Sequence, residues 1–539
     1  MSRARRSLVP LLLAIGVGLA FFAPDPATAQ AVLAQSSASK PMATGYPDAV
    51  PALPLGPPGT TQTATQRELA PGVRLTTIVA GKASTSDSWA LVSLQATQAA
   101  ADDLAQRVRA QGRVASVQRI DERAGDDPQV GPLGWLVVSR GYRSEADAQQ
   151  ANAALKAAGV VGLGVSNTAL FEANATGPWV VRILRVDHRQ LRRVHAVLAT
   201  GVVPGRETTS SLAARLGAVA AVNGGYFVVG AADGVPGDLA GIGVQDGVYD
   251  SEAVADRAAL VLDAGRSTVA SVTTHQRLRS SDGAAIDLNG VDRSVGRIRD
   301  CGAPGDQPFE RAMQDLTCTN PNEIVAFDSA FGASSQPGPG VAVTLDRAGR
   351  VVQAREQRGA AIPASGRVLE GIGAGADWLR GHARVGQRMT VSSAFRADNR
   401  PLVLRKATGV VNGGPFLVRG GRPFVDAYRQ GFVHPGDPGF YFAFGVARNP
   451  RTMAGFDGRG DLFLVSVDGR NPGYSIGMSF AEQSRVMLAL GARAALNLDG
   501  GGSTTMVAGR RLLGRPSDPT GERPVGDVVA ILPTHPPMD

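Results

Sequence analysis

The string LNLDGGGSTTMVAG, residues 496–509, brings together more chemically capable groups than any other stretch of the chain. An apolar strand that ends here would carry Asn497 and Asp499 on one face, because side chains alternate along a strand. The glycines that follow leave room for backbone N–H groups to converge on an anion, and hydroxyls add further donors. These donors belong to Gly500, Gly501, Gly502, Ser503 and Thr504. We expect a carboxylate beside an anion-binding loop; the alternative is a tight hairpin with a turn aspartate.

Two further strings offer arginines, whose planar guanidinium groups suit phosphate oxygens. GVARNPRTMAG places Arg448 and Arg451 on either side of an Asn-Pro pair, and the alternative there is a solvated turn. LFLVSVDGRNPG is typical of a buried strand that ends at Asp468, with Arg470 two residues later, and the alternative is a hairpin turn. The expected site therefore combines cations with a second carboxylate.

Residues at other strand ends could contact a sugar or rim the site. AAVNGGYF holds Asn223 before two glycines and Tyr226, although the same letters suit a hairpin turn. RPSDPTGERPVGD is a stiff charged loop whose Arg523 would either rim a site or pair internally. Glu482 ends the capping box SFAE, which gives it a structural role to set against a catalytic one.

No motif requires a cofactor. None of the six histidines lies in a metal-ligand or catalytic-triad pattern. The chain has neither a P-loop nor a G-x-S-x-G motif, which argues against nucleotide hydrolysis and serine-esterase chemistry. We expect no required cofactor; a metal site is unknown from the sequence, although clustered carboxylates would suit calcium.

These strings must be positioned by one large domain, expected over residues 175–535. Short β-rich runs such as VVRILRVD, RAALVLD and DVVAIL alternate there with glycine turns, and few stretches suit helices. We therefore predict an α+β fold in which this β-rich domain, with mixed or antiparallel sheets, follows a smaller domain.

The smaller domain is expected over residues 87–165, where the sequence contains an internal repeat. Twice, an alternating strand precedes a helix that closes at a glycine, and Ser144 is placed to cap the second helix. Further strands near residues 114–120 and 160–165 would complete a βαββαβ, ferredoxin-like arrangement. The pattern resembles the SPOR domain, which implies peptidoglycan binding; the alternative is a ferredoxin-like spacer.

Residues 1–29 have the basic start, short apolar run and small residues before Ala29 that are typical of a cleaved signal peptide. The alternative is an uncleaved membrane anchor. Residues 30–86 are rich in Ala, Ser, Thr, Pro and Gln and predict a disordered linker. We expect a secreted, cell-wall-associated protein without membrane contact after cleavage.

Charge and cysteine content agree with export. The net charge of +8 suits an anionic wall polymer, and the alternative is a basic surface that only aids solubility. No basic run is interleaved with aromatic residues, so nucleic acid is not an expected partner. Cys301 and Cys318 are a close pair in an exported chain and predict one disulfide.

Five of these strings, in order, resemble the motifs of the phosphodiester glycosidase family: AAVNGGYF, GVARNPRTMAG, LVSVDGR, LNLDGGGSTTM and RPSDPTGERPVGD. The resemblance implies hydrolysis of a sugar–phosphate glycosidic bond, and bacterial relatives are often described as exopolysaccharide biosynthesis proteins. By motif match it implies the site residues Asn223, Arg448, Asp468, Arg470, Asp499, Gly500, Gly501, Gly502, Ser503, Thr504 and Arg523.

Residues and resemblance together predict an exported hydrolase that cleaves a glycosyl phosphodiester in cell-envelope polysaccharide and is tethered to peptidoglycan by its SPOR-like domain. A phosphate leaving group is acidic, so charge neutralisation and a carboxylate matter more than a strong general acid. We assign neutralisation to Arg448, Arg470 and the glycine loop, and the carboxylate role to Asp499 with Asp468 as its partner. The alternatives are a glycosidase acting on phosphate-free wall glycans and a non-catalytic cell-wall-binding protein.

Overall fold

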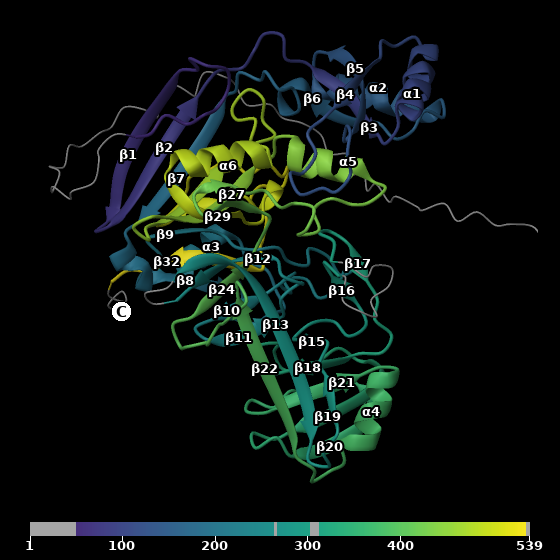
Figure 1. Ribbon diagram of the computed structural model, residues 1–539, viewed down its shortest axis with the longest axis vertical. Helices are drawn as coiled ribbons and strands as arrows, with labels where there is room; N and C mark the ends of the chain where they lie inside the picture. The colour runs from purple at the N-terminus through teal and green to yellow at the C-terminus, as the bar shows by residue number, and fades with distance from the viewer. Residues whose placement is uncertain (1–49, 264–266, 302–311, 535–539) are drawn as a thin grey trace, which may run out of the picture. The chain divides into compact units, whose positions relative to one another are not determined.

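Antiparallel sheets dominate the computed structural model, which describes residues 50–263, 267–301 and 312–534 (Figure 1). The chain is mostly β with few helices, so within the expected α+β class it lies toward the all-β end. One strand pair among the described residues is parallel, β15 (Gly290–Val291) with β18 (Ile324–Phe327). The predicted signal peptide lies outside the described residues. In the described part of the chain, no helix is long and apolar enough to cross a membrane.

The first sheet has eight strands in the order β1-β2-β7-β28-β27-β29-β25-β26. Alternation along its central strand β7 sends Val181 and Ile183 into one core and Leu184 and Val186 into another, so both faces are covered. Helix α6 (Phe480–Ala489) packs on the first of these faces. The strands are β1 (Gln62–Ala70), β2 (Val73–Ala80), β7 (Trp179–Val186), β28 (Leu462–Val467), β27 (Arg451–Asp457), β29 (Ala492–Asn497), β25 (Phe416–Arg419) and β26 (Arg422–Pro423).

The prediction of a disordered linker over residues 30–86 is wrong from residue 50 onward. Strands β1 and β2 form a hairpin whose register joins Gln62 to Ala80, and β2 pairs with β7. Strand β1 is polar and exposed along most of its length because it is the edge of the sheet. Its composition therefore matches that of a linker, while its order comes from backbone pairing with distant residues. Residues 30–49 lie outside the described part.

The second face of the first sheet packs against a five-stranded sheet in the order β31-β30-β9-β32-β8, and the two sheets share one apolar core. Helix α3 (Thr209–Arg215) covers the far face of this smaller sheet. Because the two sheets stack, the ends of β9, β27 and β29 are brought together. The smaller sheet contains β31 (Arg511–Leu512), β30 (Met506–Ala508), β9 (Ala220–Asn223), β32 (Asp527–Ile531) and β8 (Val194–Leu198).

Two more sheets complete the large domain, joined by the long strands β13 and β22 that are prominent in Figure 1. One contains β11 (Val248–Ser251), β10 (Gly243–Gln245), β24 (Gly409–Asn412), β12 (Ala258–Leu262), β13 (Thr268–Ser280), β22 (Met389–Ala397), β23 (Arg400–Pro401) and β14 (Ala285–Asp287). The other contains β15, β18, β21 (Arg367–Gly371), β19 (Gly338–Leu345) and β20 (Val351–Arg358), with α4 (Ala374–His382) packed on it. A two-stranded ribbon, β16 (Ile298–Arg299) with β17 (Thr317–Cys318), carries the predicted disulfide, which is confirmed between Cys301 and Cys318 with Cα atoms 5.5 Å apart.

The expected βαββαβ arrangement is present, with strand order β4-β5-β3-β6, which is the ferredoxin-like order. Ser144 caps its second helix through a capping box with Asp147. We call this unit the βαββαβ module. Its elements are β3 (Trp89–Gln95), α1 (Gln98–Ala110), β4 (Ser116–Ile120), β5 (Gly134–Tyr142), α2 (Glu145–Ala157) and β6 (Gly164–Asn167).

Both faces of the module's sheet are covered. Leu91 and Val137 pack under α1 and α2, whereas Ala90, Leu136 and Val138 belong to the same core as α6 and β7. The module therefore shares its core with the large domain instead of forming an independent unit.

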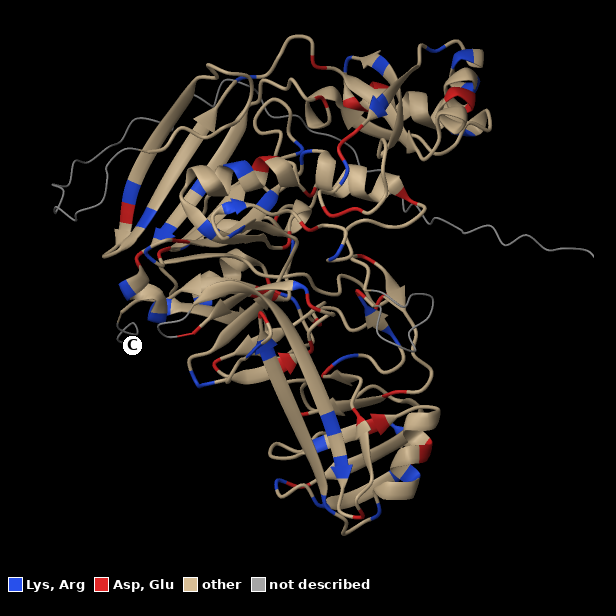
Figure 2. Cartoon of the chain, in the orientation of Figure 1, with Lys and Arg blue, Asp and Glu red and all other residues tan. Residues whose placement is uncertain are grey.

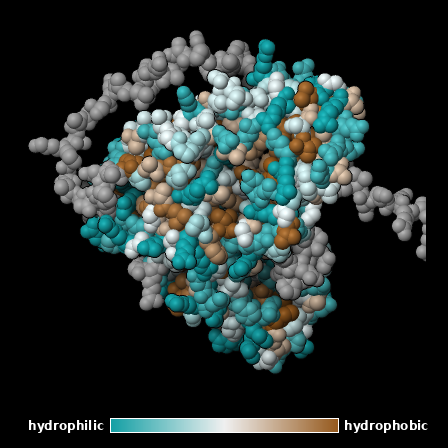
Figure 3. Space-filling model, turned by 45° about the horizontal axis from the view of Figure 1, so that its top comes forward, coloured by the Kyte–Doolittle hydropathy of each residue, from teal (hydrophilic) through white to brown (hydrophobic). Residues whose placement is uncertain are grey.

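Hydrophobic side chains on the face seen in Figure 3 appear as separate patches among hydrophilic ones.

Candidate active site

Asn223, at the end of β9, joins three strand ends and is fully buried. Its Nδ2 donates to the Asp499 carbonyl at 2.8 Å, and its Oδ1 accepts from the Thr452 hydroxyl at 2.6 Å and from the Thr505 N–H at 3.1 Å. An amide can do this because it carries both a donor and an acceptor. Asn223 therefore fixes the backbone that carries Asp499 and does not line the cavity beside it.

That cavity has a volume of about 200 Å³, and most of the cationic and acidic residues expected in the site line it. Asp499 lines it together with Arg451, Arg470 and Arg523. The other residues on its wall are Tyr226, Phe227, Val229, Ala240, Arg299, Asp300, Gln314, Asp315, Phe444, Asn449, Gly500, Gly501 and Gly502.

The Asp499 carboxylate is partly exposed in this cavity and accepts the Gly500 N–H at 2.8 Å. Burial raises its pKa to about 6, against the opposing effects of the Ser503 hydroxyl, the Gly500 N–H and the charge of Arg523. The group is thus mainly ionised at neutral pH, yet basic enough to accept a proton from water.

Arg451 is a buried cation without a carboxylate partner among the described residues. It is 1% exposed, lies over the rings of Phe444 and Phe480, and donates to the carbonyls of Met478, at 3.0 Å, and Phe444. Burial lowers its pKa to about 10, which leaves it charged at neutral pH. An unpaired buried charge is costly, and an anion in the cavity would offset that cost.

Arg470 and Arg523 extend this positive region. Arg470 donates to Asn449 Oδ1 at 3.0 and 3.1 Å, and the described residues offer it no carboxylate either. Burial, followed by the charge of Arg523, lowers the Arg470 pKa. Arg523 is held by Asp518 through two hydrogen bonds of 2.8 and 3.0 Å. The cavity therefore places the Asp499 carboxylate beside Arg451 and Arg470, two cations that lack acidic partners among the described residues.

The glycine loop reaches the cavity wall, but its N–H groups are largely used within the protein. The N–H of Gly500 donates to Asp499, that of Gly501 to Pro450, and that of Ser503 to Gly500. A Cβ on Gly502 would lie 2.2 Å from an Arg523 nitrogen and from an Asp518 carboxylate oxygen, so a side chain here would displace that ion pair. The expected anion nest is thus replaced by arginines, and the buried Ser503 and Thr504 do not line the cavity.

Arg448 and Asp468, which the motif match places among the site residues, do not line this cavity. Arg448 forms a buried ion pair with Glu482 at 2.8 Å and donates to the carbonyls of Ala169 and Glu172. Asp468 pairs with the buried Arg182 at 2.9 Å. Both charges are neutralised inside the fold, and Glu482 also closes the predicted capping box with Ser479.

Sequence reasoning named Arg451 beside Arg448 but kept only Arg448 among the site residues, and it missed Phe444. Arg451 stands in the same string as Arg448, at the start of β27, so the signal was present but did not distinguish the two. Phe444 projects from a π-helical turn, η4 (Phe442–Val446), which no local pattern indicates. Arg299 and Asp315 reach the wall from beside the disulfide, in a stretch without a motif.

One group of described residues has ligand atoms spaced for a metal: Asp187, His188 and Asp461. It does not line the cavity, and its carboxylates pair with Arg189 and Arg185. Calcium binding at the candidate site stays a prediction.

Comparison with known proteins adds independent information. Residues 339–532 match the family described as phosphodiester glycosidase. A Burkholderia pseudomallei protein described as exported is 36% identical, with a TM-score of 0.81 over 90% of this chain and 99% of that one. A hypothetical protein from Synechocystis is 16% identical, with a TM-score of 0.52 over 88% of this chain and 81% of that one. The zebrafish N-acetylglucosamine-1-phosphodiester alpha-N-acetylglucosaminidase catalytic domain is 16% identical, with a TM-score of 0.34 over 68% of this chain and 80% of that one. No curated protein matches the chain.

Proposed function

Since the chain belongs to the phosphodiester glycosidase family, we propose that it hydrolyses a glycosyl phosphodiester, a sugar-1-phosphate linkage, in cell-envelope polysaccharide. The observation that carries this proposal is that the Asp499 carboxylate, Arg451 and Arg470 line the same cavity. A phosphodiester places an anionic phosphate next to an anomeric carbon, which matches cations beside a carboxylate.

In the proposed reaction a water oxygen bonds to C1 of the sugar, and the bond from C1 to the phosphate oxygen breaks. The phosphate leaves with the bonding electron pair as a phosphomonoester, and one proton of the water passes to Asp499 and then to solvent. Arg451 and Arg470 neutralise the charge that develops on the leaving oxygen. Because that oxygen is already weakly basic, no strong general acid is needed.

The two alternative functions fit the cavity less well. A phosphate-free glycan would leave Arg451 and Arg470 without a counter-charge in a partly buried site. A wall-binding protein without catalysis has no need of a carboxylate that faces a cavity beside two arginines. The interspersed acidic and basic residues in Figure 2 give no support to a nucleic-acid partner.

We further propose that the protein is secreted and associated with the wall, and that it needs no cofactor. The disulfide and the likeness to a protein described as exported support secretion. Peptidoglycan binding by the βαββαβ module stays a prediction. Because the face of its sheet opposite the helices is covered, binding would have to use the helical face or the loops.

The test is hydrolysis of a panel of methyl glycosyl-1-phosphodiesters that differ in the sugar. Wild type should release methyl phosphate from at least one member, with and without a chelator of divalent cations. Asp499→Asn should lower turnover by about 10²–10⁴-fold, because the uncharged amide cannot accept a proton. Near-wild-type turnover by a folded Asp499→Asn protein, with folding checked by circular dichroism, would overturn the assignment.

A further inference from the structure

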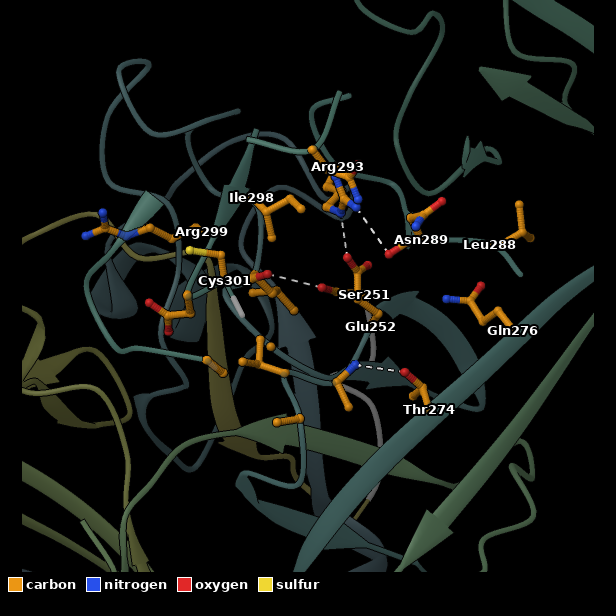
Figure 4. Close-up of a pocket in the computed structure, with 18 of the residues that line it drawn as sticks. Ser251, Glu252, Thr274, Gln276, Leu288, Asn289, Arg293, Ile298, Arg299 and Cys301 are labelled. Carbon is orange, nitrogen blue, oxygen red and sulfur yellow. Dashed lines mark hydrogen bonds and ion pairs between the residues drawn. The ribbon is translucent and has the colours of Figure 1, made fainter. Parts of the chain in front are cut away.

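A second and larger cavity, of about 550 Å³, adjoins the candidate active site. Arg299 and Asp300 line both cavities, so the two share a wall. Figure 4 shows Arg299 at one end of the larger cavity and Gln276 and Leu288 at the other. Its volume lies in the range of small-molecule sites, about 300–1,000 Å³.

Among the described residues, the larger cavity offers no unpaired arginine to a phosphate. Arg293 is buried and paired with Glu252 at 2.6 Å and with Glu323 at 2.7 Å. Arg299 is paired with Asp233 and Asp315. Every arginine on the wall is therefore already neutralised by carboxylates, in contrast to Arg451 and Arg470 in the smaller cavity.

Two polar residues that line this cavity have buried oxygens without hydrogen-bond partners among the described residues. Asp238 and Gln276 are 5% and 4% exposed, and Oδ1 of the first and Oε1 of the second have no hydrogen-bond partner among the described residues. Buried polar atoms without partners are uncommon, and a sugar hydroxyl can either donate or accept. Leu239, Val254 and Leu288 supply apolar contacts for the carbon face of a ring.

We propose that this second cavity binds an uncharged, hydroxyl-rich sugar unit adjacent to the phosphodiester that is cleaved. This inference rests on the proposed function and extends it: the substrate is an oligomer or polymer of glycosyl phosphates, not a single glycosyl phosphate. The smaller cavity holds the phosphate and the anomeric centre, while the larger one holds the next sugar along the chain.

The test compares synthetic glycosyl-1-phosphate oligomers of one, two and three units, built from the sugar that the panel selects and ending in a methyl phosphodiester. Two added hydrogen bonds should raise kcat/KM by about tenfold from one unit to two or three. Val254→Trp fills the larger cavity and should reduce the ratio of kcat/KM for three units to that for one unit to near one. Val248→Trp, the same change at an exposed site on β11 outside the cavity, should keep the wild-type ratio.

Gln276→Leu is a second variant, close in size, that removes the Oε1 acceptor and should also lower the ratio. A wild-type ratio near one, or an undiminished ratio in both folded cavity variants, would overturn the inference while leaving the proposed function standing. Hydrolysis of none of the oligomers and none of the panel would overturn the proposed function, and the inference with it.

Discussion

Arg448 and Arg451 lie three residues apart and have opposite surroundings. Arg448 is paired with Glu482 inside the fold, whereas Arg451 faces the cavity without an acidic partner among the described residues. Pairing thus separates a structural arginine from one that is available to a substrate, and exposure does not, because both are buried.

Substitution of the two arginines should therefore affect different measurements. Arg451→Gln should lower kcat/KM for phosphodiesters by about 10²–10³-fold, the usual effect of losing one group that stabilises developing charge, with little loss of stability. Arg448→Gln should lower the free energy of unfolding by about 3–5 kcal/mol, because it leaves Glu482 buried and unpaired. Steady-state kinetics and thermal unfolding of both variants check this, and the reverse pattern would contradict the site.

The pH dependence of kcat/KM should report Asp499. Burial raises its pKa to about 6, so activity that needs the carboxylate should fall as the pH drops through about 6 and reach a plateau above it. Arg523 lowers this pKa by its charge, so Arg523→Gln should move the acidic limb to higher pH. A limb that stays in place or moves to lower pH would show that Asp499 is not the group observed.

Sequence reasoning singled out Asp499, Arg470 and Arg523, which line one cavity in the structure, because each stands in a string with several chemically capable neighbours. It could not separate Arg451 from Arg448, because the acid that neutralises Arg448 lies 34 residues away. The partner of Asp468, Arg182, is on a different strand of the sheet. Charge pairing is a tertiary property, and local spacing does not contain it.

At the scale of elements, the segment that carries Phe444 is held by the βαββαβ module. Helix α5 (Pro438–Tyr441) contacts β3, and Phe444 stacks on Phe440 and Phe432 at ring distances of 5.6 and 5.7 Å. Both carboxylate oxygens of Asp126 accept backbone N–H groups, from Tyr428 at 2.9 Å and from Arg429 at 2.8 Å. The module therefore supports one wall of the candidate site.

Asp126→Ala should lower the free energy of unfolding by about 2–3 kcal/mol, because two charge-assisted hydrogen bonds to backbone are lost. Asp121→Ala is the matched control, since its ion pair with Arg119 is exposed and should contribute little. Chemical denaturation of the two variants checks the prediction. Equal losses would mean that the Asp126 contacts do not stabilise the segment.

The elements of the module were predictable from sequence because the strands alternate and each helix closes at a glycine, Gly112 or Gly159. The hairpin of β1 and β2 was not, because an exposed edge strand has the polar composition of a linker. The sequence also did not show that the module shares a core with the large domain. The alternation of β3 indicates two apolar faces, but it does not indicate which element covers the second one.

At the scale of the whole molecule, several carboxyls are buried without a cationic partner in the part of the chain that the structure describes. Burial raises the pKa of Asp527 to about 7 and that of Asp250 to about 8, with Asp328 and Asp527 adding to the shift at Asp250. A carboxyl whose pKa is higher in the folded state binds its proton more tightly there. Its contribution to stability is therefore present at low pH and is lost as the pH rises from about 4 toward the folded value.

Asp250→Asn should remove one such group. The free energy of unfolding of the variant, relative to wild type, should rise between pH 4 and pH 8 by up to about 1.4 kcal/mol per pH unit, because the amide does not titrate. Urea denaturation at pH 5, 6.5 and 8 measures this difference, with Asp256→Asn at an exposed site as the control. A difference that is constant with pH would contradict the buried, proton-binding state of Asp250.

The pairing of β7 with β28 also determines the order in which segments of the chain can fold during synthesis. Residues 179–186 lie between a hairpin that precedes them and a strand, 462–467, that is synthesised almost 300 residues later. Until that strand is made, the edge of β7 that pairs with it has no partner. The parts of the apolar core to which the module and β2 contribute also remain incomplete. Strand pairs with a large sequence separation form slowly, and their unpaired edges are prone to aggregation until they form. The first strands to be made are thus among the last to be enclosed, and the chain cannot finish folding from its beginning.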